Sequence, residues 1–230
     1  MIRSLILLFL IAYPLLGETG GKNKGLTSDL FPRTDPKLVG LVYQMLQVVD
    51  LLFAQQGIVY WIDGGTALGA VRHQGMIPWD DDADLVFLME DEERIFALRE
   101  EFTKYGFYLT KEEIFRLYPS SEIRYPFIDI AGYSLYPDNT LRFDSKLLSE
   151  MFPRFYWLPE EVACLKRVKF GPIELNAPTS MMRYLLTGYG EDCMSMATFQ
   201  TLHGPSRRKV VIKKKVKITD FSPAEYALKS

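Results

Sequence analysis

Apolar side chains at intervals of three and four residues mark the first regular element of this sequence. The pattern runs from Pro36 to Gln56 and predicts an amphipathic helix, because this spacing places the apolar side chains on one face. Asp35 stands before it as a cap, and Gly57 provides a stop. A similar pattern over Asp91–Tyr105 predicts a second helix, with its acidic residues in the first turn, where the helix dipole favours negative charge.

Short runs rich in β-branched and aromatic residues predict strands between and after these helices. The predicted strands cover residues 58–62, 85–88, 106–110, 113–118, a run around Asp129, and 132–135. A short helix is expected over Thr66–His73, ended by Gly75. The later strands are expected to form an antiparallel meander beside the strand 85–88. The pattern favours an α+β fold, with a small mixed sheet flanked by helices.

Length and composition favour one ordinary folded domain. The 230 residues, 48% of them hydrophobic and 24% charged, provide one sizeable core. Residues 1–17 are typical of a signal peptide or short anchor, because their apolar run falls short of the roughly twenty residues that span a membrane. Residues 18–34 are typical of a linker, and the folded domain is expected at 35–230. Such a chain would reach the secretory pathway (Golgi or ER lumen, or extracellular space) or a bacterial cell envelope.

Charge is distributed unevenly along the chain. The net charge of −2 argues against a protein that coats nucleic acid. Residues 207–217, however, hold seven cations and no acid. This basic segment is either a solvated edge or a contact for an anionic acceptor, a nucleotide or a lipid surface, so that peripheral membrane contact is one expectation. Cys164 and Cys193 permit at most one disulfide, and each is expected to be a small buried residue.

An acidic cluster precedes the second predicted strand. From Asp80 to Glu93 the chain has eight acidic residues and no basic one. Alternation along a strand would send Asp80, Asp82 and Asp84 to one face and Asp81 to the other. Carboxylates within about 5 Å of one another repel, so a cation favours the arrangement. Three such groups suit Mg²⁺ or Mn²⁺, which can neutralise the charge that develops when a phosphoryl group is displaced.

Two other interpretations of this cluster remain open. Asp80, Asp82 and Asp84 also match the first ligand positions of an EF-hand calcium loop, but Leu85 occupies the position that requires glycine. The second alternative is an acidic turn on a solvated surface, and the apolar strand that follows argues against it.

A pair of glycines lies at the predicted turn from the first strand into the short helix. Glycine allows close backbone approach, so the N–H groups of Gly64, Gly65 and Thr66 at the helix N-terminus can hold an anion such as a pyrophosphate. Arg72 and His73 end this helix. They either complement its dipole or hold a donor phosphate.

Asp129 is a lone acid in an apolar, strand-like run. It either caps a turn, or serves as a metal ligand or as the base that takes a proton from an attacking hydroxyl. Aromatic residues crowd together between Pro137 and Pro159, either as a packed loop over the core or as a wall for a sugar or a base.

The run from Asp63 to Asp84 closely resembles the signature of the LicD family, which includes bacterial phosphocholine transferases and fukutin-related ribitol-phosphate transferases. A later stretch, Phe170 to Asp192, is similar to the family's closing segment. The resemblance covers residues 36–195. The first motif is long and specific, and the second supports it.

The resemblance implies a nucleotidyltransferase-like α+β domain that transfers a phospho-alcohol from a CDP-activated donor to a hydroxyl of a glycan or glycolipid. It assigns Asp80, Asp82 and Asp84 to the family's metal-binding aspartates and Asp129 to its later strand carboxylate, with Asp82, Asp84 and Asp129 as the catalytic group. The zinc-binding cysteine cluster of the fukutin-related enzyme is not matched here, so no structural zinc is expected.

Three alternatives to this function are kept. A related enzyme would transfer the nucleotide itself and make a CDP-alcohol. A non-catalytic carbohydrate- or metal-binding module would not need the glycine turn. A non-catalytic scaffold would be indicated by a broken motif, and the motif here is intact.

Overall fold

The computed structural model describes residues 33–203 and 210–227, and for residues 198–203 and 210–214 it describes only the course of the backbone. The described residues form two compact units: 33–194 with 221–227, and 195–203 with 210–220. The expected signal peptide or anchor (1–17) and almost all of the expected linker (18–34) lie outside the described residues. The expected division of the chain therefore stays a prediction.

Helix α1 (Pro36–Gln56) begins and ends where the sequence predicts. The side chain of Asp35 accepts a hydrogen bond from the N–H of Lys37 at 2.8 Å, and Gly57 takes the left-handed conformation (φ 62°) that closes the helix. Among the described helices, α1 alone is long and apolar enough to cross a membrane. One of its faces is nevertheless buried in the core of the larger unit, as expected of a core helix.

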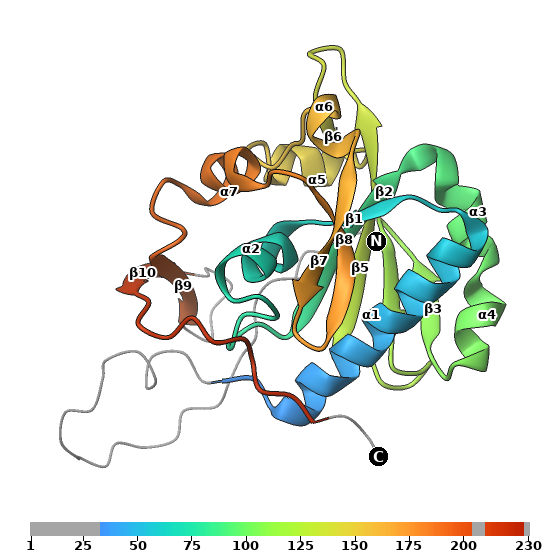
Figure 1. The fold of residues 1–230 in the computed structure, drawn as a ribbon, viewed down its shortest axis with the longest axis horizontal. Coiled ribbons are helices and arrows are strands. Elements are labelled where there is room, and N and C mark those ends of the chain that lie inside the picture. Colours follow the sequence, from blue (N-terminus) through green and yellow to red (C-terminus); the bar gives the residue numbers. More distant parts are fainter. Residues whose placement is uncertain (1–32, 204–209, 228–230) are drawn as a thin grey trace. The chain divides into compact units, whose positions relative to one another are not determined.

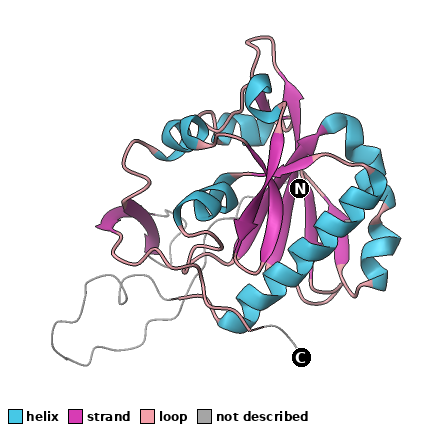
Figure 2. Ribbon diagram, viewed as in Figure 1, coloured by secondary structure: helices cyan, strands magenta, loops and turns pink. Residues whose placement is uncertain are grey.

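A six-stranded mixed sheet forms the centre of the larger unit (Figures 1 and 2). Its strands are β1 (Tyr60–Ile62), β2 (Asp82–Leu88), β3 (Tyr108–Lys111), β4 (Phe115–Tyr118), β5 (Phe127–Leu135) and β6 (Leu141–Phe143). Their order is β1-β2-β5-β4-β3, and β6 pairs with β5. Strands β2 and β5 run parallel, and the other pairs of this sheet are antiparallel. The predicted α+β class is thus confirmed, and so is the meander β3-β4-β5. The two strands expected around Asp129 and over 132–135 are, however, a single strand, β5.

The two faces of this sheet differ in polarity because side chains alternate along each strand. One face carries apolar side chains such as Phe87 and Phe115, which contact each other with ring centroids 5.9 Å apart. Phe96, from the helices after β2, contacts Phe115 on this face. The opposite face of β2 and β5 carries Asp82, Asp84 and Asp129.

The helix predicted over Asp91–Tyr105 is interrupted. It consists of a 3₁₀ turn (Met89–Asp91), α3 (Glu92–Ala97) and α4 (Arg99–Lys104). The break lies at Leu98, whose ψ of 0° departs from helical geometry and whose N–H donates to Ile95, only three residues earlier. The buried Leu98 side chain remains in the core.

The second half of the larger unit contains elements that the sequence patterns did not predict. These are α5 (Lys146–Met151), α6 (Pro159–Val162), the hairpin β7 (Leu165–Phe170) and β8 (Ile173–Pro178), and α7 (Met182–Tyr189). The hairpin turn needs glycine at Gly171, which has φ 62° and whose Cβ position would lie 2.3 Å from the Tyr43 hydroxyl.

The segment 221–227 returns to the start of α1. The N–H of Ala224 donates to Met76 at 2.9 Å, and the N–H of Ala227 donates to Pro36 at 2.8 Å. A Cβ atom on Gly40 would lie 2.0 Å from the Ala227 carbonyl oxygen. Glycine at this position is therefore required for the close approach of the two backbones.

The smaller unit is an antiparallel hairpin of β9 (Met196–His203) and β10 (Val210–Lys217). The basic segment 207–217 lies mostly in β10, and its first three residues lie outside the described residues. A contact of this segment with a membrane or another anion stays a prediction.

Candidate functional site

Two neighbouring parallel strands bring three of the predicted carboxylates together. Asp82 and Asp84 lie on β2, and Asp129 lies on β5 directly opposite Asp84. Because directly paired residues point to the same face of a sheet, the three side chains converge. Each offers one oxygen, and these oxygens lie within 4.8 Å of one another. Such spacing suits oxygens that share one cation.

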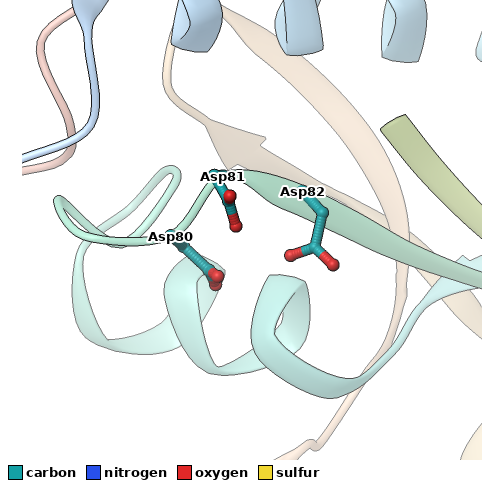
Figure 3. Close-up of side chains that lie close together, drawn as sticks. All are labelled: Asp80, Asp81 and Asp82. Carbon is teal, nitrogen blue, oxygen red and sulfur yellow. The ribbon is translucent and has the colours of Figure 1, made fainter. Parts of the chain in front are cut away.

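Asp80 and Asp81 lie in the turn that leads into β2. Their carboxylates approach that of Asp82, and oxygens of the three lie within 4.8 Å of one another, beside α2 (Gly64–Arg72) (Figure 3). The expectation that Asp81 points to the opposite face is wrong. The strand begins only at Asp82, so the alternation of an extended backbone does not apply before it. Asp82 belongs to both groups of carboxylates.

The carboxylates are buried (Asp81, Asp82 and Asp129) or half-buried (Asp80 and Asp84) close to like charges. Burial raises the pKa of Asp82 and Asp84 well above the ordinary value, and the neighbouring acids raise both further: Asp80 is the larger contributor at Asp82, and Asp129 at Asp84. Burial and the charge of Asp81 raise the pKa of Asp80 to about 6. Both effects mean that the ionised cluster is unfavourable by itself. A bound divalent cation would remove this cost.

The predicted glycine turn holds one of these carboxylates. The N–H of Gly65 donates to Oδ2 of Asp84 at 2.9 Å, and the Thr66 hydroxyl accepts from the N–H of Asp84 at 2.8 Å. The N–H of Gly64 donates to the Tyr184 hydroxyl at 3.1 Å. The turn thus fixes Asp84 at the N-terminus of α2, which begins two residues earlier than expected. Binding of a phosphate by Gly64, Gly65 and Thr66 stays a prediction.

Side chains at the two glycines would fill the space between the acids. A Cβ on Gly64, whose φ is 46°, would lie 2.6 Å from Oδ2 of Asp84. A Cβ on Gly65 would lie 2.9 Å from Oδ2 of Asp80 and 3.4 Å from Oδ2 of Asp84. The residues present therefore fit a hard divalent cation: they provide several carboxylate oxygens, and glycine at these two positions leaves room beside Asp80 and Asp84.

Arg72 and His73 are buried at the end of α2. The Nε–H of Arg72 donates to Nε2 of His73 at 3.0 Å, and its Nη1 donates to the Cys193 carbonyl at 2.7 Å. Since Nε2 of His73 is an acceptor, its Nδ1 carries the proton and donates to the Ser222 carbonyl at 3.1 Å. These contacts give both side chains structural partners, and their predicted role toward a donor phosphate stays a prediction.

Comparison with known proteins places this site in a family. The sequence profile described as LicD/FKTN/FKRP, nucleotidyltransferase domain, matches residues 57–180, which is more than half of the chain. The chain belongs to the LicD family. This membership agrees with the predicted nucleotidyltransferase-like fold and with the intact acidic motif.

Three relatives of this LicD-family chain differ in how much of them it covers. It is 30% identical over 151 residues to the uncharacterized protein RP689 of Rickettsia prowazekii, which is 65% of this chain and 54% of that protein. It is 52% identical over 44 residues to human ribitol 5-phosphate transferase FKRP (19% of this chain, 9% of that protein). It is 54% identical over 55 residues to the lipopolysaccharide cholinephosphotransferase LicD of Haemophilus influenzae (23% and 20%). The chain thus spans about half of the first relative, and much less of the two transferases.

A buried carboxylate in the LicD motif has a role that the sequence patterns did not reveal. Asp63 accepts hydrogen bonds from Nε1 of Trp157 at 2.7 Å and from the Tyr133 hydroxyl at 2.9 Å. The Trp157 ring stacks on Tyr184 at 3.9 Å, the same tyrosine that contacts Gly64. Tyr184 therefore connects the glycine turn to the buried Trp157 and, through Trp157, to Asp63. The signal available in the sequence was the acid directly before the glycine pair.

The second residue that the sequence patterns missed is Arg116 on β4. Its Nε–H donates to Oδ1 of Asp129 at 2.5 Å, across directly paired positions of β4 and β5. Burial raises the pKa of Asp129, and the Arg116 guanidinium opposes this shift. The available signal was a cation between two apolar strand residues, Phe115 and Leu117.

Proposed function

We propose that the chain is a metal-dependent transferase of the LicD type, which moves a phospho-alcohol such as phosphocholine or ribitol phosphate from a CDP-activated donor to a hydroxyl of a glycan or glycolipid. The balanced reaction forms a phosphodiester bond to the acceptor oxygen, breaks the diphosphate bond, and releases CMP and a proton. We place it in the secretory pathway or in a bacterial cell envelope.

The observation that carries this proposal is the convergence of carboxylate oxygens from two strands beside a glycine-rich helix start. Oxygens of Asp82, Asp84 and Asp129 lie within 4.8 Å of one another. The N–H of Gly65 lies 2.9 Å from the same Asp84 carboxylate. Carboxylates that are held in place in this way can bind a divalent cation, and such a cation can neutralise the charge of a donor diphosphate.

Asp80, Asp82, Asp84 and Asp129 would hold Mg²⁺ or Mn²⁺. When bound, the cation supplies charge neutralisation at the phosphoryl oxygens. The glycine turn would orient the donor diphosphate against these acids. Asp129, whose position is fixed by Arg116, would orient the acceptor hydroxyl for in-line attack or accept its proton. These roles rest on positioning, which is the main contribution of proteins to phosphoryl transfer.

CMP release provides the test. Purified protein is incubated with several CDP-alcohols and glycan acceptors, with and without Mg²⁺, and CMP is measured by chromatography. We expect CMP only with the cation and none from the variant Asp82→Asn. This variant should fold, because the substitution removes one of several repelling buried charges.

The matched control is Asp91→Asn, since Asp91 is also a buried acid but pairs with Arg94, at the start of α3. Full activity of Asp82→Asn would disprove the proposed metal site. Release of pyrophosphate from CTP and a phospho-alcohol, without CMP, would assign the chain to CDP-alcohol synthesis instead.

A further inference from the structure

The polar face of the sheet continues beyond the carboxylates. Asp84 on β2 pairs with Asp129 on β5, Asp129 pairs with Arg116 on β4, and Arg116 pairs with Thr110 on β3. Because directly paired residues share a face, these four side chains form one row across four strands. The glycine turn lies at the Asp84 end of the row. The other end is therefore a second region that adjoins the proposed reaction centre.

Two arginines and three aromatic rings make up this second region. We call it the arginine–aromatic strip, and it comprises Tyr108, Arg116, Tyr118, Arg124 and Phe127. The Arg116 guanidinium lies 4.8 Å from the ring centroid of Phe127. The Arg124 guanidinium lies 5.1 Å from the ring of Tyr108 and 4.7 Å from that of Tyr118. Both arginines are thus held by aromatic faces.

The strip has hydrogen-bond donors for an anion. Arg116 uses Nε for Asp129, and among the described residues its Nη2 has no hydrogen-bond partner. Arg124 is exposed, and no acidic side chain in the described part of the chain pairs with it. Tyr108 is 38% exposed, so an aromatic face beside these donors is accessible. The exposed guanidinium of Arg124 and the partly buried one of Arg116, beside the accessible ring of Tyr108, are suited to a ligand with both an anionic group and a ring.

We infer that the arginine–aromatic strip binds the acceptor and that this acceptor is an anionic saccharide, bound through a phosphate or a carboxylate. The inference rests on the proposed function. In-line displacement requires the acceptor oxygen to attack the phosphorus from the side opposite the leaving CMP. With the donor diphosphate at the glycine turn, the acceptor side is that of Asp129 and the strip. Arg116 and Arg124 would bind the anionic group, and the rings of the strip would pack against the sugar.

A binding experiment tests this inference without requiring turnover. Glucose, glucose 6-phosphate and glucuronate are titrated into the full chain, and binding is followed by NMR through the saccharide signals and the arginine Nε–H resonances. We expect at least one anionic sugar to bind about tenfold more tightly than glucose, as a charge-assisted hydrogen bond would provide. Preference for glucose 6-phosphate would identify a phosphate subsite, and preference for glucuronate a carboxylate subsite.

Variants assign the binding to the strip. Arg124→Gln removes an exposed side chain and should fold normally, yet it should abolish the preference for the anionic sugar. Arg116→Lys keeps the charge but loses the planar fork, so it should retain part of the preference. The matched control is Arg99→Gln: Arg99 also lies over an aromatic ring, Phe96 at 3.7 Å, but on α4 away from the carboxylates.

Two results would overturn the inference. One is equal binding of all three sugars by the wild-type chain. The other is a variant Arg124→Gln that binds CDP more weakly but binds the sugars as before. That result would show that the strip binds the donor and not the acceptor. Failure of the proposed function is distinguishable, since it would leave the sugar preference in place while no CMP is released.

Discussion

Gly65 offers a way to disturb the proposed metal site without changing any carboxylate. In Gly65→Ala the new Cβ would lie 2.9 Å from Oδ2 of Asp80 and 3.4 Å from Oδ2 of Asp84. The nearer atom is the end of a side chain that can rotate away, so the fold can accommodate the methyl group. Alanine is also the better helix former, by up to about 1 kcal/mol. We therefore expect the free energy of unfolding to change by less than about 1 kcal/mol.

The effect on cation binding should be much larger. Displacing Asp80 removes one oxygen from the cluster, although Gly65 is not itself a ligand. Substitutions that disturb the support of metal ligands typically reduce affinity about 10- to 100-fold. The affinity for Mn²⁺ is measured from the electron paramagnetic resonance signal of the free ion during a titration, and the stability from thermal unfolding of the same samples.

Gly69→Ala is the matched control one helical turn later in α2. Its Cβ would lie 2.5 Å from the backbone oxygen of Gly75, which cannot rotate away. Overpacking of this kind costs about 1–3 kcal/mol of stability. The two variants should therefore differ in opposite ways. Gly65→Ala should lose Mn²⁺ affinity and keep its stability, and Gly69→Ala should lose stability and keep its Mn²⁺ affinity. Unchanged Mn²⁺ affinity in Gly65→Ala, or an equal loss in both, would refute the reasoning.

Three further predictions concern stability. In urea denaturation, Trp157→Phe should lower the free energy of unfolding by about 1.5–3 kcal/mol more than Trp61→Phe. The reason is that Trp157 donates a hydrogen bond to the buried Asp63, whereas Nε1 of Trp61 has no hydrogen-bond partner among the described residues. Equal losses in the two variants would contradict this prediction. Gly40→Ala should displace the backbone of Ala227 and lower the free energy of unfolding by about 1–3 kcal/mol. Amide hydrogen exchange at Ala227 should become faster. Unchanged exchange at Ala227 would show that its close approach to Gly40 is unimportant. Mg²⁺ at a hundred times its dissociation constant should raise the free energy of unfolding by about 2.7 kcal/mol, as seen by calorimetry with and without a chelator; no shift would argue against cation binding.

Local signals were sufficient for part of this fold. Helix α1 is predicted to the residue because its cap, its apolar spacing and its stop are all contained in one stretch of sequence. The same holds for the acidic motif, in which adjacent residues carry the information. The helix after β2 was predicted too long, because apolar spacing continues through Leu98 although the backbone there does not remain helical.

Non-local pairings could not be predicted from patterns. Nothing in the local sequence specifies that β5 lies parallel to β2, or that Arg116 faces Asp129 across two strands. The hydrogen bond from Trp157 to Asp63 joins residues far apart in the chain. Such contacts depend on strand order and register, which the period of apolar residues leaves undetermined.

The parallel pairing of β2 with β5 has a consequence for the order in which the molecule is made. Asp84 leaves the ribosome long before Asp129, and the two meet only after α3, α4, β3 and β4 have closed a long crossover. Closing such a loop costs conformational entropy before the contacts between β2 and β5 can compensate for it. The site that Asp82, Asp84 and Asp129 share is therefore complete only once β2 and β5 have paired. A cation bound there would stabilise the paired strands.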